Sequence, residues 1–180
     1  MEDSISSILI LVLLITMSAY FSATETAYSS LNKIKLKSIA NKGNKKAKLA
    51  LELSEKYDSV ISTILIGNNI VNIATASLAT VLFTKLLGSS GVTVSTIVMT
   101  ILILIFGEIS PKSIAKDIPE SFAIVSAPLL NVFCIILKPV NHIFCLWKKL
   151  ISKVLKIQKH SGITEDEILT IVEEAENEGG

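Results

Sequence analysis

Charged residues are scarce in this sequence, and arginine is missing altogether. Aspartate, glutamate and lysine make up 18% of the 180 residues, whereas hydrophobic residues make up 50%. With a mean hydropathy of +0.59, this composition is typical of a membrane protein. The formal net charge is only +1, so there is no excess of positive charge for nucleic acid, and we expect no nucleic-acid partner.

Cysteine and histidine are equally rare, which restricts the chemistry of any site. Cys134 and Cys145 lie in an apolar segment without the spacing of a metal site, and we interpret both as reduced packing residues. His142 and His160 are isolated and are expected at an interface or in solvent. No serine–histidine pair falls on facing apolar segments and no metalloprotease motif is present, so we do not expect an enzyme.

Three apolar stretches are long enough to cross a bilayer, which takes about 20 helical residues. They cover residues 5–30, 60–87 and 92–110. A lysine-rich loop separates the first two, with seven lysines between Lys33 and Lys48. Because positively charged loops stay in the cytoplasm, we expect a multi-pass plasma-membrane protein with its N-terminus outside and its C-terminus inside.

A fourth apolar stretch, residues 120–147, is interrupted by prolines. If it crossed the bilayer, the lysines that follow it would lie outside, against the positive-inside rule. A bent helix lying in the inner interface avoids this conflict. We therefore predict an all-α membrane protein with three transmembrane helices and a belt-like interfacial helix, in a transmembrane domain that covers residues 1–147.

The remaining segment, residues 148–180, is polar. It begins with a basic juxtamembrane part and continues into a stretch with seven acidic residues between Glu165 and Glu178. Thr164 and Glu167 have the spacing of a capping box, which predicts the start of a helix. We interpret this stretch as an acidic helix that opens a cytoplasmic region.

One carboxylate stands within an apolar run. Glu108 lies near the end of the third stretch, where an ionisable residue by default faces protein or a water-filled cavity and indicates a functional site. Pro111 has no N–H, so the carbonyl of Gly107 lacks its helical donor. Oxygen ligands of this kind suit a hard cation such as Mg²⁺ or Ca²⁺. The alternative is a helix end at the headgroups, with Glu108 extending into water.

Polar residues on the first two stretches recur at helical spacing and so share one face of each helix. These residues are Ser18, Ser22, Glu25 and Ser29 on the first stretch and Asn68, Asn72 and Thr75 on the second, with Gly67 and Asn69 beside them. Counted at 1.5 Å per residue, Ser22, Asn68 and Glu108 all fall in the inner half of the bilayer. They could converge on one partly dehydrated cation. Alternatively, the stripes make interhelical hydrogen bonds only.

Three motifs resemble the transmembrane domain of the cyclin M (CNNM)/CorC proteins. They are Phe21-Ser-Ala-Thr-Glu-Thr-Ala27, Gly67-Asn68 with Val71-Asn72, and Phe106-Gly-Glu-Ile-Ser-Pro-Lys112. The resemblance implies a homodimer that exports Mg²⁺ by alternating access, with Na⁺ as the coupling ion. It also implies that ATP acts through a CBS-domain pair that follows the acidic helix.

By motif, the family's Mg²⁺ ligands fall on Ser22, Asn68, Gly107 and Glu108. A further set of residues is expected to line the site: Glu25, Asn69, Asn72, Ser18 and Pro111. The leading hypothesis is therefore a Mg²⁺ transporter. The second hypothesis is a membrane-anchored sensor that binds Mg²⁺ and reports it to a cytoplasmic domain without net transport.

Overall fold

A computed structural model describes residues 2–144 of the chain, with side chains from Ile5 onward. Met1–Asn141 form one compact unit, which is built from helices and, over its described residues, contains no strand. The predicted basic segment and acidic helix lie outside the described residues, as do Cys145, His160 and the end of the expected interfacial helix. The prediction of an all-α membrane protein is confirmed.

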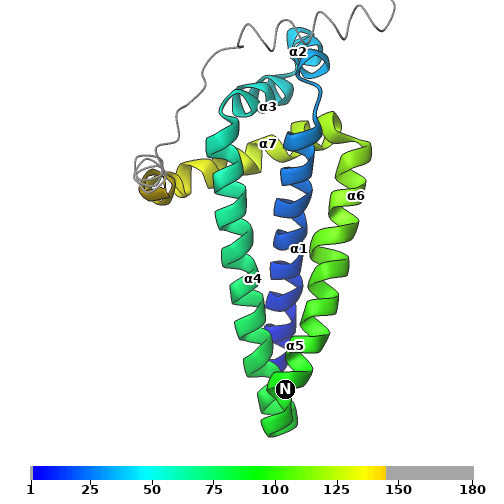
Figure 1. Ribbon diagram of the computed structural model, residues 1–180, viewed down its shortest axis with the longest axis vertical. Coiled ribbons are helices and arrows are strands. Elements are labelled where there is room, and N and C mark those ends of the chain that lie inside the picture. Colours follow the sequence, from blue (N-terminus) through cyan, green and yellow to red (C-terminus); the bar gives the residue numbers. More distant parts are fainter. Residues whose placement is uncertain (1, 145–180) are drawn as a thin grey trace, which may run out of the picture. The chain divides into compact units, whose positions relative to one another are not determined.

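The long first helix, α1 (Glu2–Ser30), lies between two others. On one side is α4 (Tyr57–Leu87), and on the other is a continuous helical run from Gly91 to Asp117 (Figure 1). The stretches Ile5–Ser30 and Tyr57–Asp117 are apolar and long enough to cross a membrane, the second as a hairpin. Large hydrophobic side chains are exposed along all three helices, as expected for surfaces in contact with lipid.

The helical run after α4 has three parts. A 3₁₀ turn, η1 (Gly88–Ser90), reverses the chain and leads into α5 (Gly91–Leu102). A π-helix, η2 (Ile103–Ile109), follows, and then α6 (Ser110–Asp117). The expected third stretch ended at residue 110, before Pro111, but the helix continues. Pro111 lies in the first turn of α6, directly after the π-helix, and the helical run continues through it.

The predicted lysine-rich loop is instead folded into two short helices, α2 (Lys33–Asn41) and α3 (Lys45–Glu55). Asn32 caps α2 by accepting hydrogen bonds from the amides of Ile34 and Lys35 at 2.9 and 3.1 Å. Asn44 caps α3 in the same way. The lysine pattern set the expected topology, but the two capping asparagines were the signal for helices.

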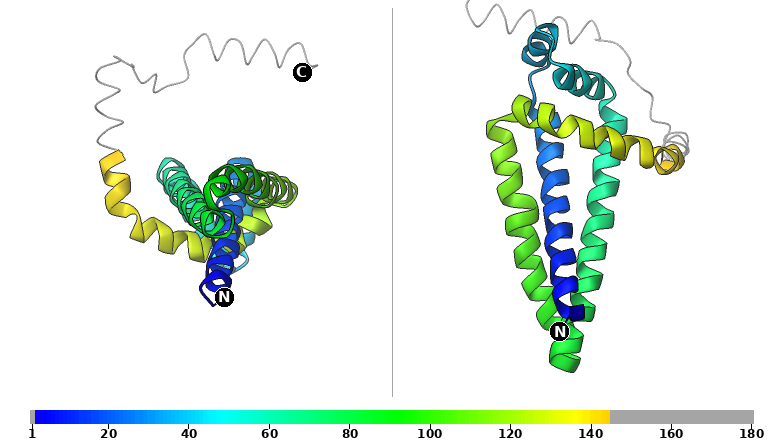
Figure 2. Two further views of the ribbon diagram at one scale, coloured as in Figure 1. Left: turned by 90° about the horizontal axis from the view of Figure 1, so that it is seen from below. Right: turned by 180° about the vertical axis from the view of Figure 1, so that it is seen from behind.

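The next helix, α7 (Pro119–Ile136), lies crosswise to α1 and α4 near the end that carries α2 and α3 (Figures 1 and 2). By length and composition alone α7 is also apolar enough to cross a membrane. Pro128 lies inside it without ending it, and the helix breaks at Leu137, before the Lys138–Pro139 pair. Its crosswise direction agrees with a belt at the membrane surface.

Aromatic packing and one ion pair hold α7 in this position. The ring centroids of Phe21 on α1 and Phe133 on α7 lie 4.9 Å apart, and the Tyr20 hydroxyl donates to the Ser126 carbonyl at 2.9 Å. At the start of α7, Glu120 is almost buried and accepts from the Lys35 ammonium at 2.9 Å. These contacts fasten both ends of α7 to the rest of the unit.

Candidate functional site

The first two long helices approach each other closely at Gly67. A Cβ atom at this position would lie 2.5 Å from the Phe21 ring, so only glycine permits the contact. Gly67 is buried and precedes Asn68 directly. The close approach therefore carries the polar stripe of α4 onto the polar stripe of α1.

Three side-chain oxygens converge where those stripes meet. Ser18 is fully buried, and its hydroxyl lies 3.1 Å from Asn68 Oδ1 and 2.8 Å from Asn72 Oδ1. A serine hydroxyl has one hydrogen, so it can fully satisfy only one of the two amide oxygens. Three oxygens therefore face one another with a single hydrogen between them, and such a set of oxygen lone pairs can serve a cation.

Ser22 adds an unpartnered oxygen one turn along α1. Its side chain is fully buried, yet its hydroxyl has no hydrogen-bond partner among the residues that the structure describes. An unsatisfied buried hydroxyl costs about 1–3 kcal/mol. The neighbouring buried hydroxyl, that of Thr24, is by contrast bonded to the carbonyl of Tyr20 at 2.6 Å. A ligand at Ser22 would remove this penalty.

The π-helix η2 brings Gly107 and Glu108 to the same region. Gly107 is buried against α1, where an added Cβ would lie 3.1 Å from the Ser18 hydroxyl. Glu108 is half-buried and, within the described part of the chain, forms no ion pair. The Glu108 carboxylate is therefore available to a mobile cation.

Backbone oxygens are also released here. The Ser110 amide bonds to the carbonyl of Ile105, five residues earlier, as in a π-helix. In that register the carbonyl of Phe106 would accept from the amide of residue 111, but Pro111 has no N–H to donate. If the register were α-helical, the carbonyl of Gly107 would be the one that lacks the missing Pro111 donor. Both carbonyls are thus candidates for ligands, whereas the sequence had indicated only Gly107.

The remaining expected lining residues lie in three different settings. Glu25 pairs with the Lys112 ammonium at 3.4 Å, about one turn from Ser22. Asn69 is exposed on α4. Pro111 lines an apolar groove of about 440 Å³ with Tyr20 and Phe122, away from the polar stripes. Of the five, Ser18 and Asn72 are the residues that hydrogen bonds join to the oxygen cluster.

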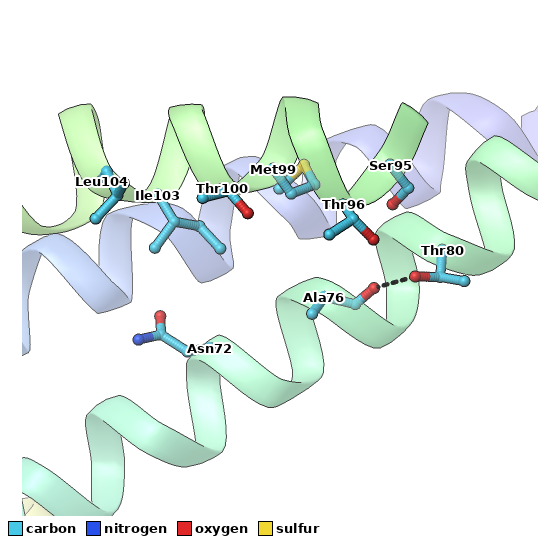
Figure 3. A pocket seen from close by; sticks show the side chains of 9 residues that line it. All are labelled: Asn72, Ala76, Thr80, Ser95, Thr96, Met99, Thr100, Ile103 and Leu104. Atoms are coloured by element: carbon cyan, nitrogen blue, oxygen red, sulfur yellow. Dashed lines mark hydrogen bonds between the residues drawn. The ribbon is translucent and has the colours of Figure 1, made fainter. Parts of the chain in front are cut away.

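A cavity of about 260 Å³ opens from the cluster between α4 and the α5–η2 run. Asn72 stands at one end of it, and the hydroxyls of threonines from both walls line its length (Figure 3). Its lining residues are Asn72, Ala76, Thr80, Ser95, Thr96, Met99, Thr100, Ile103 and Leu104. Asn72 therefore belongs both to the oxygen cluster and to a partly polar space beyond it.

The chemistry of this region is that of neutral oxygens with few charges. Over the described residues, no three histidine, cysteine, aspartate or glutamate side chains gather closely enough to hold a metal ion. Such a donor set does not suit zinc or copper, but it suits a hard cation that keeps part of its water. The sequence could not reveal the π-helix, although a glycine beside a carboxylate in an apolar run and a nearby proline were its available signals.

Comparison with known proteins adds a family to this geometry. The family model described as the cyclin M transmembrane N-terminal domain matches residues 9–180. The chain is 37% identical, over 171 residues, to a UPF0053 protein of Haemophilus influenzae, covering 93% of this chain and 40% of that protein. It is 35% identical, over 166 residues, to the UPF0053 inner membrane protein YfjD of Escherichia coli, covering 90% and 39%.

A more distant relative carries a functional name. The chain is 28% identical, over 182 residues, to a polyamine export protein of Haemophilus influenzae, covering 93% of this chain and 42% of that protein. The chain therefore spans about two fifths of the length of the curated relatives it matches. The Escherichia coli relative is named an inner membrane protein, and the family model describes a transmembrane domain rather than a known enzyme family.

Proposed function

The chain belongs to the cyclin M transmembrane N-terminal domain family, and on that premise we propose that it is the membrane core of a divalent-cation transporter with Mg²⁺ as its substrate. One observation carries the proposal. Two amide oxygens compete for the single hydrogen of Ser18, next to the unpartnered hydroxyl of Ser22. A bound cation would satisfy these oxygen atoms better than their hydrogen bonds to one another do.

The proposed site holds a partly dehydrated ion. Mg²⁺ takes about six oxygens near 2.1 Å and keeps several waters. Ser22, Asn68 and the backbone near Gly107 supply neutral ligands, and Glu108 supplies the charge. Because Asn72 also lines the cavity, the ion has a path along hydroxyl groups toward the end of the molecule that carries η1. Alternating access would open the site to each side in turn, and Na⁺ is the proposed coupling ion.

The test of this function is a flux measurement with the protein in liposomes. Mg²⁺ entry is followed with an enclosed dye, with and without a Na⁺ gradient. The proposal expects saturable flux above that of empty liposomes. Binding of Mg²⁺ without flux would favour the sensor hypothesis instead. Because one relative is named a polyamine export protein, spermidine is included as a competitor; flux of spermidine but not of Mg²⁺ would overturn the choice of substrate.

The proposed topology predicts which positions react with an impermeant thiol reagent. In a background with Cys134 and Cys145 replaced by serine, Ser89→Cys in η1 should be labelled from outside the cell. Asn44→Cys, between α2 and α3, should react only after the membrane is opened, since the lysine-rich helices stay inside. External labelling at Asn44 would reverse the orientation, and Ser161→Cys, outside the described residues, tests whether residues 120–147 cross.

We also propose a homodimer, because one face of α4 is poorly suited to lipid. Asn69 is exposed in the middle of the helix, so its amide interrupts an otherwise apolar surface that includes Ile73, one turn along. An amide facing hydrocarbon is costly, so protein should cover it. In a two-fold dimer the same face meets itself, which brings the two Asn69 positions together.

Crosslinking in membranes tests this interface. In the cysteine-free background, Asn69→Cys should give a covalent dimer with a short bis-thiol reagent in more than about half of the molecules, as expected for a self-facing contact. Ile97→Cys, on the exposed surface of α5, is the matched control and should stay monomeric. Equal crosslinking at both positions would indicate random collision rather than the proposed dimer.

A further inference from the structure

An ion pair lies one helical turn from the proposed cation site. Lys112 Nζ is 3.4 Å from Glu25 Oε2. Glu25 follows Ser22 by three residues on α1, and Lys112 follows Glu108 by four residues along η2 and α6. On α1, residues three apart lie on one face of the helix, about one turn apart; Lys112 lies in the first turn after η2, the element that carries Glu108. The pair is therefore close to both the charged group and the unpartnered group of the site.

Both members of the pair are partly shielded from water. The Glu25 side chain is 28% exposed and the Lys112 side chain 44% exposed. No other basic residue occurs between Lys85 and Lys112, so Lys112 is the first positive charge that the third long helix brings toward this region. Its ammonium group is held on a flexible stem, and in the structure it pairs with Glu25.

Charge balance makes Lys112 a competitor of the cation. Without an ion, Glu25 and Glu108 contribute two negative charges and Lys112 one positive charge, so Lys112 balances one of the two carboxylates. When a divalent cation enters, it can balance both carboxylates alone, and Lys112 then adds only repulsion. Like charges near one another in a partly dehydrated region repel more strongly than in water.

We propose that Lys112 is the internal counter-ion of the cation site. It neutralises Glu25 when the site is empty, and it moves away from the carboxylates when a divalent cation binds. This inference rests on the proposed transport function and adds a means of release to it. An ion must bind well enough to enter and weakly enough to leave. A lysine that returns as the ion departs balances one of the two partly shielded carboxylates that the ion leaves behind.

The inference predicts opposite effects for the two partners. Lys112→Met removes the competing charge but keeps the stem, so Mg²⁺ should bind about tenfold more tightly while the maximal flux falls about tenfold. Glu25→Gln removes a negative charge, so binding should weaken by about fivefold or more. If the pair contributed only to stability, both variants would change the Mg²⁺ affinity in the same direction.

Titration calorimetry with purified protein and MgCl₂, together with liposome flux, measures these effects. Lys112→Arg keeps the charge and should restore both the affinity and the flux toward those of the natural protein. If Lys112→Met unfolds, the double variant Glu25→Gln/Lys112→Met removes both members of the pair, so neither is left without its partner, and it should bind more tightly than Glu25→Gln alone.

The outcomes separate the two proposals. If the natural protein binds Mg²⁺ but Lys112→Met, or the double variant in its place, gains no affinity, the counter-ion role is wrong and the transport function stands. If the natural protein neither binds nor moves Mg²⁺, the proposed function fails and the counter-ion role fails with it.

Discussion

Replacing Glu108 by glutamine is expected to reduce Mg²⁺ flux by at least about a hundredfold and to abolish measurable binding. The carboxylate is half-buried, and no ion pair engages it within the described residues. At an effective dielectric constant of about 20, two unit charges 4 Å apart attract by about 4 kcal/mol, and a divalent ion doubles this value. Because about 1.4 kcal/mol corresponds to a tenfold change in affinity, no set of neutral ligands can compensate for the loss.

The Glu108→Gln variant keeps the shape of the side chain, so the helix run from α5 to α6 should remain intact. Glu52→Gln, at an exposed glutamate of α3, is the matched control and should retain full flux. Size-exclusion chromatography confirms that both variants are folded. If Glu108→Gln is folded and moves Mg²⁺ at the natural rate, the carboxylate is only a helix end near the headgroups and the proposed site is wrong.

The long helices could be predicted from the sequence because the membrane imposes a simple rule on them. A segment of this length with few charges must satisfy its own backbone groups, so apolar length alone indicated α1 and α4. The expectation of a crosswise α7 required a second argument, the positions of the lysines. The helices α2 and α3 were missed because a lysine-rich segment was interpreted by its charge, whereas Asn32 and Asn44 determine its local structure.

The π-helix limited the prediction of the site. Residues on an α-helix share a face at offsets of three and four, and this rule placed Ser18 and Ser22 on one stripe and Asn68 and Asn72 on another. One extra residue in a turn rotates the remainder of the helix by about 100°, so the same rule does not hold across η2. The close approach of Gly107 to Ser18 could therefore be found only from the structure.

The role of Asn72 also changes with the structure in view. Spacing alone predicts that Asn72→Ala affects stability more than affinity, because Asn72 lies one turn beyond Asn68. In the structure, however, its Oδ1 atom is nearer to the Ser18 hydroxyl than that of Asn68, at 2.8 against 3.1 Å. Asn72 belongs to the oxygen cluster, so we expect Asn72→Ala to change the Mg²⁺ affinity as well as the stability.

The second large effect is expected from Asn68→Ala, which should weaken Mg²⁺ binding by about 5- to 150-fold, the range that corresponds to losing about 1–3 kcal/mol of a buried polar contact. Asn68 supplies a ligand oxygen without charge, so its loss costs less than that of Glu108. Ser22→Ala should weaken binding less, since its hydroxyl is the weaker ligand. Titration calorimetry measures both.

Matched controls for these variants are available on the same helices. Thr75 is fully buried on α4, and its hydroxyl bonds to the Val71 carbonyl of its own helix at 2.7 Å. Thr24 is bonded in the same way on α1. Thr75→Val and Thr24→Val therefore remove a buried hydroxyl of similar depth without touching the cluster, and both should retain the natural affinity.

The double variant of Asn68 and Asn72 distinguishes a shared site from separate contacts. Both amide oxygens depend on the one hydrogen of Ser18, so removing Asn72 commits that hydrogen to Asn68 and reduces the lone-pair density that a cation would use. Asn72→Ala alone should therefore weaken binding about tenfold, and the double variant should lose clearly less than the product of the two single losses. If the losses multiply, the two asparagines act independently, and the convergence at Ser18 does not describe the cation site.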